Sequence, residues 1–275
     1  MAMIHSDSTK ITTQIALEHA VTHFWDDFLF ENCNTLNEEG STLALKYYVD
    51  ILSRLSIEKR QPVLGEFLKM TKKYPGPQKF FIKMLCDAYS LPSSIYKNED
   101  IYIFLLNYCL QSNMYESWEK QMYSNLLKSA NQNRPGKPAN NFCFTNLKNS
   151  ISTLYNTEAE YLILYFYNPE CEACRETSKV LEASNMNGFL KNGKIKLLAI
   201  SLEPNSVLWH ATAKTKPFWL HGQDAKDNIQ SQGIYDLSAI PTLYLLDKHK
   251  NVILKDCKTE DIISYLNYKH INAGK

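Results

Sequence analysis

The stretch that decides the fold is Tyr161-Leu-Ile-Leu-Tyr-Phe-Tyr167, followed after three intervening residues by Cys171-Glu-Ala-Cys174. The first part is an apolar run of strand length, and the second opens a segment that reads as a helix. Pro169, between them, cannot donate a ladder hydrogen bond and helps to end the strand. Two cysteines at this spacing between a strand and a helix indicate a dithiol that cycles with a disulfide.

The spacing of the two cysteines suits reversible disulfide formation. Residues three apart share a helix face with their Cβ atoms about 5–6 Å apart, and a disulfide needs about 3.8 Å, so a small tightening of the first turn joins the sulfurs. Cys171 would lie at the helix N-terminus, where unpaired N–H groups stabilise a thiolate. We therefore expect Cys171 to attack and the more shielded Cys174 to resolve the mixed disulfide.

Acidic side chains surround the motif. Glu170, Glu172 and Glu176 place negative charge near the thiolate, and Arg175 and Lys179 offset part of it. A less stabilised thiolate makes a dithiol couple less oxidising. The sequence therefore predicts a disulfide carrier that works as a reductant.

The motif has three other interpretations: half of a zinc site, a haem attachment site, or two inert cysteines. A structural zinc site normally takes a second pair of ligands, and the sequence contains no second CxxC. Haem attachment requires His directly after the second cysteine, but position 175 is Arg. Redox chemistry is the reading that the residues favour, and we expect no metal ion.

The N-terminal half has the pattern of a helical bundle. Short, punctuated links separate amphipathic segments and favour antiparallel neighbours. The expected helices span residues 15–29, a segment capped by Ser41 and reaching Leu55, and residues 58–73, 78–89, 98–110 and 115–130.

The C-terminal half alternates strands and helices, which implies an α/β domain with a sheet covered on both faces. Strands are expected at 161–167, 195–201, 242–246 and 252–254, with helices at 171–184, 206–214, 225–232 and 259–267. The predicted fold class is thus α+β with two domains. They are an all-α domain over residues 1–133 and an α/β domain over 141–275, joined by a Pro- and Gly-containing linker over 134–140.

The C-terminal half also resembles a known family. Leu162 to Cys174, and Ile240-Pro-Thr-Leu-Tyr-Leu-Leu-Asp247, are similar to the motifs of the thioredoxin superfamily, and specifically of the TlpA/ResA-like thiol–disulfide oxidoreductases of bacterial envelopes. Lys137 to Phe144 looks like the family's opening strand, so the resemblance covers roughly residues 135–275. The helical half looks like an uncharacterised domain that precedes such modules in some Gram-negative anaerobes.

The resemblance implies a thioredoxin fold and several residue roles. Pro241 would be a cis-proline facing the dithiol, a rare geometry that usually has a purpose, and the Ile240 backbone would pair with a substrate peptide as an added strand. Glu203, just after the strand at 195–201, either accepts a proton near Cys174 or is a solvated loop carboxylate. No cofactor is implied beyond the redox-active disulfide of Cys171 and Cys174.

The sequence departs from thioredoxin around the motif. Tyr165 occupies the place of thioredoxin's buried Asp, so that proton relay is absent. Tyr167 and Glu170 stand where thioredoxin has tryptophans and, with Glu203, are expected to support the site; Glu172-Ala173 replaces Gly-Pro. These differences argue against general thioredoxin activity and leave the basic exchange mechanism intact.

The expected function is thiol–disulfide exchange with protein disulfides as substrates and an upstream electron donor as partner. The alternative is a non-catalytic binding or redox-sensing protein whose helical domain recognises a partner protein. A net charge of +1 gives no reason to expect nucleic acid, and no apolar stretch approaches the roughly 20 residues of a membrane span. The resemblance implies a periplasmic or cell-envelope setting with the signal segment missing from this chain, the alternative being the cytoplasm.

Overall fold

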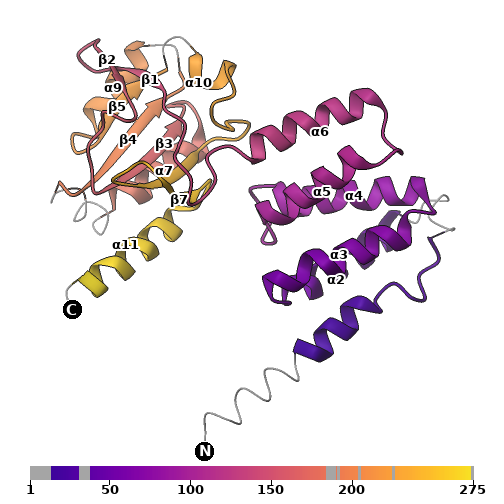
Figure 1. The fold of residues 1–275 in the computed structure, drawn as a ribbon. Helices are drawn as coiled ribbons and strands as arrows, with labels where there is room; N and C mark the ends of the chain where they lie inside the picture. Colours follow the sequence, from indigo (N-terminus) through magenta and orange to yellow (C-terminus); the bar gives the residue numbers. More distant parts are fainter. Residues whose placement is uncertain are drawn as a thin grey trace, which may run out of the picture. The chain divides into compact units, whose positions relative to one another are not determined.

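The chain divides into two compact units, one ending at Lys128 and the other beginning at Ser129. The structure, a computed structural model, describes residues 14–30, 38–183, 190, 193–203, 206–224 and 227–273. The first unit is built of helices and the second contains a mixed sheet with helices (Figure 1). The predicted fold class, an all-α domain followed by an α/β domain, is confirmed.

A large aromatic cluster holds the helical unit together. The ring centroids of Tyr48, Phe67 and Phe81 lie 5.2–5.3 Å from that of buried Trp25. Such edge and tilted ring contacts add to the free energy of burying the rings. The helices span residues 14–22, then α2 (Glu38–Ser53), α3 (Ile57–Thr71), α4 (Pro75–Ser90), α5 (Glu99–Gln111) and α6 (Ser117–Ala130).

The first helix, expected to reach residue 29, ends at residue 22, and two helix starts differ clearly from those expected. Helix α4 begins at Pro75 rather than at residue 78, because the first N–H groups of a helix have no partner and a proline there loses no hydrogen bond. Ser41 lies inside α2 and is not its N-cap. The start of α5 agrees with the sequence, since the side chain of Asn98 accepts a hydrogen bond from the Ile101 N–H.

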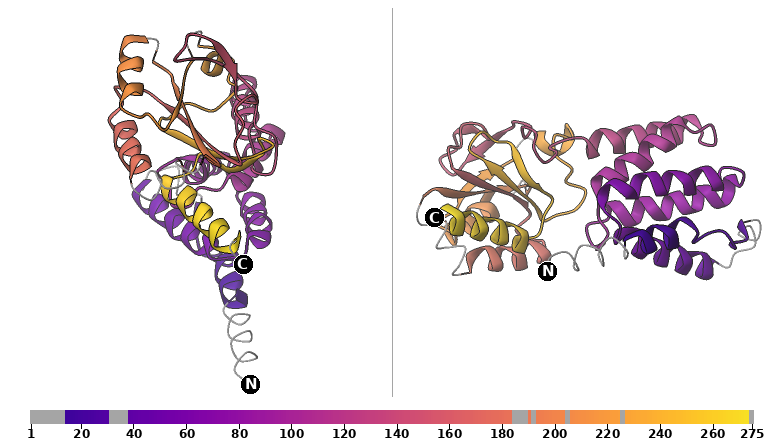
Figure 2. Two further views of the ribbon diagram at one scale, coloured as in Figure 1. Left: turned by 90° about the vertical axis from the view of Figure 1, so that its left-hand side faces the viewer. Right: turned by 60° about the horizontal axis from the view of Figure 1, so that its bottom comes forward.

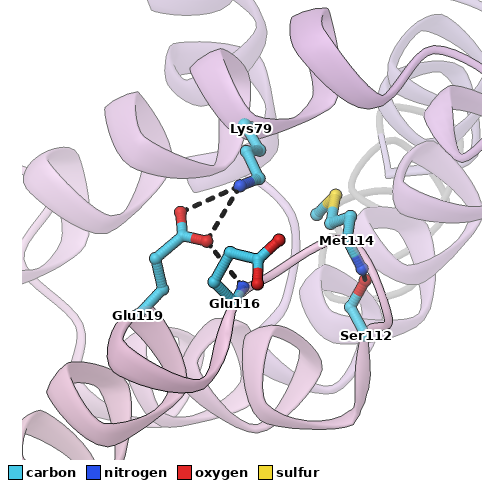
Figure 3. Close-up of polar contacts among 5 residues, drawn as sticks. All are labelled: Lys79, Ser112, Met114, Glu116 and Glu119. Atoms are coloured by element: carbon cyan, nitrogen blue, oxygen red, sulfur yellow. Dashed lines mark hydrogen bonds and ion pairs between the residues drawn. The ribbon is translucent and has the colours of Figure 1, made fainter.

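An ion pair and a helix cap share one carboxylate at the start of α6 (Figure 3). The Lys79 ammonium, from α4, lies 2.9 and 3.0 Å from the two carboxylate oxygens of Glu119. The same carboxylate accepts a hydrogen bond from the Glu116 N–H at 2.7 Å, which satisfies an otherwise unpaired donor before the helix. These contacts hold the pKa of Glu119 below its ordinary value. One side chain therefore both caps α6 and ties it to α4.

The second unit has a seven-stranded sheet in the order β2-β1-β5-β4-β3-β6-β7. Strands β3, β4 and β5 run parallel, and the remaining pairs are antiparallel. The strands are β1 (Cys143–Asn146), β2 (Ile151–Thr153), β3 (Tyr161–Tyr167), β4 (Ile195–Ser201), β5 (Leu220–Gln223), β6 (Thr242–Asp247) and β7 (Val252–Lys255). The helices are α7 (Glu172–Glu182), α9 (Ser206–Lys214), α10 (Asn228–Ser231) and α11 (Thr259–Ala273).

Side chains of the central strand β3 alternate between two cores, as the period of a strand requires. Leu162, Leu164 and Phe166 enter one core, which also contains Ile229 of α10. The other core takes residues 163, 165 and 167 of β3 together with side chains of α7 and α11. Figure 2 shows α11 close to α7, in agreement with their contacts. Both faces of the sheet are therefore covered, as predicted.

The segment expected to be a linker, residues 134–140, is hydrogen-bonded into the second unit. The Gly136 N–H donates to the Val252 carbonyl and the Val252 N–H donates to the Lys137 carbonyl, both at 2.8 Å. The Ala139 N–H donates to the Lys250 carbonyl at 2.9 Å. Its Pro and Gly content indicates irregular backbone, but the segment is paired with β7 and its preceding turn.

Strands β2 and β5 were not expected from the sequence. Strand β5, Leu220-His-Gly-Gln223, has no apolar run, yet it pairs with β4 on one side and β1 on the other. Gly222 makes this placement possible, because a Cβ there would lie 2.5 Å from the Phe144 ring and 2.6 Å from Ile200 Cδ1.

Within the described ranges, no helix has both the length and the apolar character needed to cross a membrane.

We predict that Gly222→Ala destabilises the second unit by about 1–3 kcal/mol, because the added methyl overpacks the core. The measurement is urea unfolding followed by circular dichroism. Gly65→Ala in α3 is the control, since a Cβ there meets only Phe104 at an ordinary 3.8 Å and alanine is the better helix former. Equal unfolding midpoints for wild type and Gly222→Ala would contradict the packing described.

Candidate active site

Cys171 is the N-cap of α7, directly after the loop that leaves β3. Its backbone is extended, and its Sγ accepts a hydrogen bond from the Cys174 N–H at 3.3 Å. An N-cap acceptor is usually an oxygen of Ser, Thr, Asp or Asn; here it is a sulfur. This hydrogen bond holds the Cys171 sulfur at the start of the helix.

Asn168 fixes the loop that carries Cys171. Its side-chain oxygen accepts from the Glu170 N–H at 2.8 Å, and its main-chain carbonyl accepts from the Cys171 N–H at 3.1 Å. Its side-chain amide donates to the Glu203 carboxylate at 3.3 Å. No role was predicted for Asn168, although an Asn directly after a strand is a common turn-forming residue.

Cys174 is buried, with 1% of its surface exposed, whereas Cys171 is half-buried. Both are free thiols. Burial raises the pKa of Cys174 to about 12, and the contact with Cys171 acts in the same direction. The Asn168 backbone and the Tyr165 hydroxyl lower the pKa of Cys174 and offset part of that rise. The two thiols therefore differ in the way that an attacking and a resolving cysteine require.

Ile240 and Pro241 lie beside the dithiol. The Cys171 Sγ is 3.9 Å from the Ile240 carbonyl oxygen, and the Ile240–Pro241 peptide bond is cis. The ladder between β3 and β6 begins with the pair Phe166 and Thr242. Ile240 therefore precedes this ladder, and its backbone lies outside it.

The supporting residues expected from the sequence occupy different surroundings. Tyr167 is buried at the end of β3, and its ring stacks on that of Tyr165 at 5.1 Å. Glu170 is exposed, and its carbonyl accepts a hydrogen bond from the Arg175 guanidinium at 2.8 Å. The Glu203 carbonyl accepts from the Gln223 side chain at 2.7 Å. Glu203 is thus joined to the active-site loop through Asn168.

The charges on α7 are arranged along its exposed side. Lys179 pairs with Glu176 at 2.7 Å, and both side chains are largely exposed. Such surface pairs contribute little free energy. Arg175 binds a main-chain carbonyl, and Glu172 in the first turn is exposed. The cations of this segment are thus held by contacts other than the Cys171 sulfur.

The contact between Tyr165 and α7 was not predicted from the sequence. The Tyr165 hydroxyl donates to the Cys174 carbonyl at 2.8 Å and lies 3.2 Å from the Ser178 Oγ. Ser178 follows Cys174 by four residues and therefore shares its helix face. Alternation along β3 places Tyr165 on the α7 side, but the contact itself depends on how the helix packs on the sheet.

Comparison with known proteins supports the fold described above. A thioredoxin-like protein from Bacteroides caccae, known from its crystal structure, is 31% identical to this chain and matches 93% of each chain with a TM-score of 0.85. This chain belongs to the thioredoxin-like proteins. Its helical part, residues 13–133, matches a domain of unknown function, DUF5106. Membership of this family supports a redox role in general terms.

Two further solved structures match about half of this thioredoxin-like chain. The C-terminal domain of an uncharacterized protein from Bacteroides fragilis is 39% identical, covers 49% of this chain and 98% of that one, and has a TM-score of 0.47. The thioredoxin domain of a thiol-disulfide oxidoreductase from Bacteroides vulgatus is 19% identical, covers 49% of this chain and 96% of that one, and has a TM-score of 0.44. Among curated proteins, none matches this chain.

We predict that the two active-site thiols alkylate at very different rates. In the reduced protein, brief treatment with iodoacetamide should modify Cys171 well before Cys174, because Cys174 is buried and its pKa is about 12. Since only the thiolate reacts, labelling of Cys174 should rise about tenfold per pH unit between pH 7 and pH 10. Peptide mass spectrometry measures each site, with exposed Cys143 as the internal reference. Labelling of Cys174 as fast as that of Cys143 at pH 7 would contradict the described burial.

Proposed function

We propose that this chain is a thiol–disulfide oxidoreductase that reduces protein disulfides through Cys171 and Cys174. The observation that carries the proposal is the position of the Cys171 Sγ. It is half-buried at the start of α7, accepts the Cys174 N–H, and lies 3.9 Å from the Ile240 carbonyl. A sulfur in this position is held by the helix cap yet remains open to an incoming disulfide.

The reaction has two exchange steps. In the first, the Cys171 thiolate attacks one substrate sulfur, the substrate S–S bond breaks, and the other substrate sulfur leaves as a thiolate that takes a proton from water. In the second, Cys174 attacks the Cys171 sulfur of the mixed disulfide. The proton of Cys174 balances the substrate thiolate that leaves. The substrate disulfide gains two electrons and two protons, and the protein ends with a Cys171–Cys174 disulfide.

The substrate would bind as an extended segment beside Ile240 and Pro241. Ile240 precedes the β3–β6 ladder, so its backbone is placed to pair with a peptide in the manner of an added strand. Main-chain pairing of this kind fits substrates that are proteins, because it recognises backbone and tolerates varied side chains. No cofactor enters the proposed reaction other than the dithiol itself.

The proposed direction is reduction of the substrate. The exposed carboxylates of Glu170 and Glu172 flank Cys171, and negative charge there stabilises the thiolate less than a His or Lys would. A dithiol with a less stabilised thiolate is a stronger reductant. The cycle then needs an upstream electron donor that returns the Cys171–Cys174 disulfide to two thiols. A periplasmic or cell-envelope setting is part of this proposal and rests on the resemblance to TlpA/ResA-like proteins.

The proposal predicts that Cys171→Ser abolishes reduction of insulin disulfides, by at least about 100-fold, because the attacking sulfur is gone. Turbidity of the released insulin B chain in the presence of dithiothreitol measures the rate. Cys143→Ser, which removes an exposed cysteine on β1, is the matched control and should keep the wild-type rate. If Cys171→Ser were as active as wild type, the oxidoreductase proposal would be wrong, and a binding or redox-sensing role would replace it.

A further inference from the structure

The hydroxyl of Tyr165 contacts the main chain of the resolving cysteine. It is carried by β3, which is buried from Leu162 to Tyr167, and reaches across to α7, where it donates to the Cys174 carbonyl at 2.8 Å. The ring is held in place from two sides, by a stacked contact with Tyr167 at 5.1 Å and an edge contact with Trp219 at 6.0 Å. The hydroxyl is therefore fixed in position relative to Cys174.

The carbonyl that Tyr165 binds does not depend on it. In an α-helix the carbonyl of residue i accepts the N–H of residue i+4, and for Cys174 that residue is Ser178, inside α7. A carbonyl oxygen has two lone pairs, so the bond from Tyr165 is a second one. The single O–H proton can therefore leave this carbonyl without leaving a buried group unpaired.

We propose that the Tyr165 hydroxyl is the hydrogen-bond donor that stabilises Cys174 as a thiolate during disulfide exchange. This inference rests on the proposed function, and it assigns a role to a residue that the proposed exchange steps did not involve. Contact with the Tyr165 hydroxyl lowers the pKa of Cys174, against the burial that raises it to about 12. Of the described residues, the titratable groups that bear on this thiol are Cys171 on α7, and Tyr165 and Tyr167 on β3.

The step that needs this donor is the second exchange. Cys174 must give up its S–H proton as its sulfur bonds to the Cys171 sulfur, and the bond from Cys171 to the substrate sulfur breaks. The proton that Cys174 loses is balanced by the one that the departing substrate thiolate gains. In the reverse direction Cys174 leaves Cys171 as a thiolate, so the same donor assists both directions.

Tyr165 acts as a donor and does not take the proton. Burial raises the pKa of its phenol above the ordinary value, so the hydroxyl stays protonated at any pH at which the protein works. A buried carboxylate in this place would be negatively charged when ionised and would repel a thiolate. A neutral phenol stabilises the thiolate without introducing that charge.

The test separates the two exchange steps with 5,5′-dithiobis(2-nitrobenzoate) in stopped flow. Attack by Cys171 releases the first thionitrobenzoate, and attack by Cys174 on the mixed disulfide releases the second. The full chain is used, and the signal of the other cysteines is subtracted with a Cys171→Ser/Cys174→Ser double variant. Tyr165→Phe should leave the first phase unchanged and slow the second about ten- to hundredfold, the range of one hydrogen bond to a charged group.

Tyr235→Phe is the matched control. Its hydroxyl also donates to a main-chain carbonyl at 2.8 Å, that of Asn140, but its ring lies in the opposite core of the unit. It removes the same buried hydrogen bond, so it should cost similar stability and leave both phases unchanged. A second variant, 3-fluorotyrosine at position 165, keeps the ring and the hydroxyl and is a stronger donor, so it should speed the second phase alone.

The outcomes distinguish this inference from the proposed function. An unchanged second phase in Tyr165→Phe, or equal slowing of both phases, would overturn the role of Tyr165 while leaving the dithiol chemistry in place. A first phase that survives in Cys171→Ser would overturn the proposed function and this inference together.

Discussion

Strand β3 is held by hydrogen bonds on both edges and by apolar packing on both faces, and the position of the active site depends on these constraints. It pairs with β4 from Tyr161 to Tyr167 and with β6 up to Phe166. A shift of one residue in this register would move every side chain to the other core. The end of β3, and with it the start of α7 at Cys171, is therefore fixed in the fold.

Alternate side chains of β3 enter two different cores. One set of its side chains fills a core of aromatic and aliphatic groups, and the other faces α7 with Tyr165 and Tyr167. Helix α7 places the half-buried Cys171 sulfur at its N-cap, close to the strand end, and the buried Cys174 sulfur on the helix side that packs on the sheet. Cys171 and Cys174 carry the same side chain, and their different exposure follows from one turn of helix at a buried strand end.

The sequence predicted those parts of the fold that depend on local pattern. The apolar run of β3, the helix after it and the bundle of amphipathic helices could all be read from the order of residues. Strand β5 could not, because Leu220-His-Gly-Gln223 is a strand only through its neighbours, and Gly222 is explained only by the side chains of Phe144 and Ile200. The start of α4 at Pro75 was missed because proline both ends and begins helices.

The candidate site likewise combines features that the sequence predicts with contacts that depend on packing. Cys171, Cys174 and Pro241 stand out by residue type and spacing, whereas the contact between the Tyr165 hydroxyl and the Cys174 carbonyl arises only when α7 packs on β3. The reduction potential of the Cys171–Cys174 couple, determined by equilibration with glutathione, is the most direct test of the proposed reductase chemistry. We expect a reducing value, closer to the thioredoxin level of about −270 mV than to the DsbA level of about −120 mV. A value near the DsbA level, or no reversible two-electron couple, would contradict it.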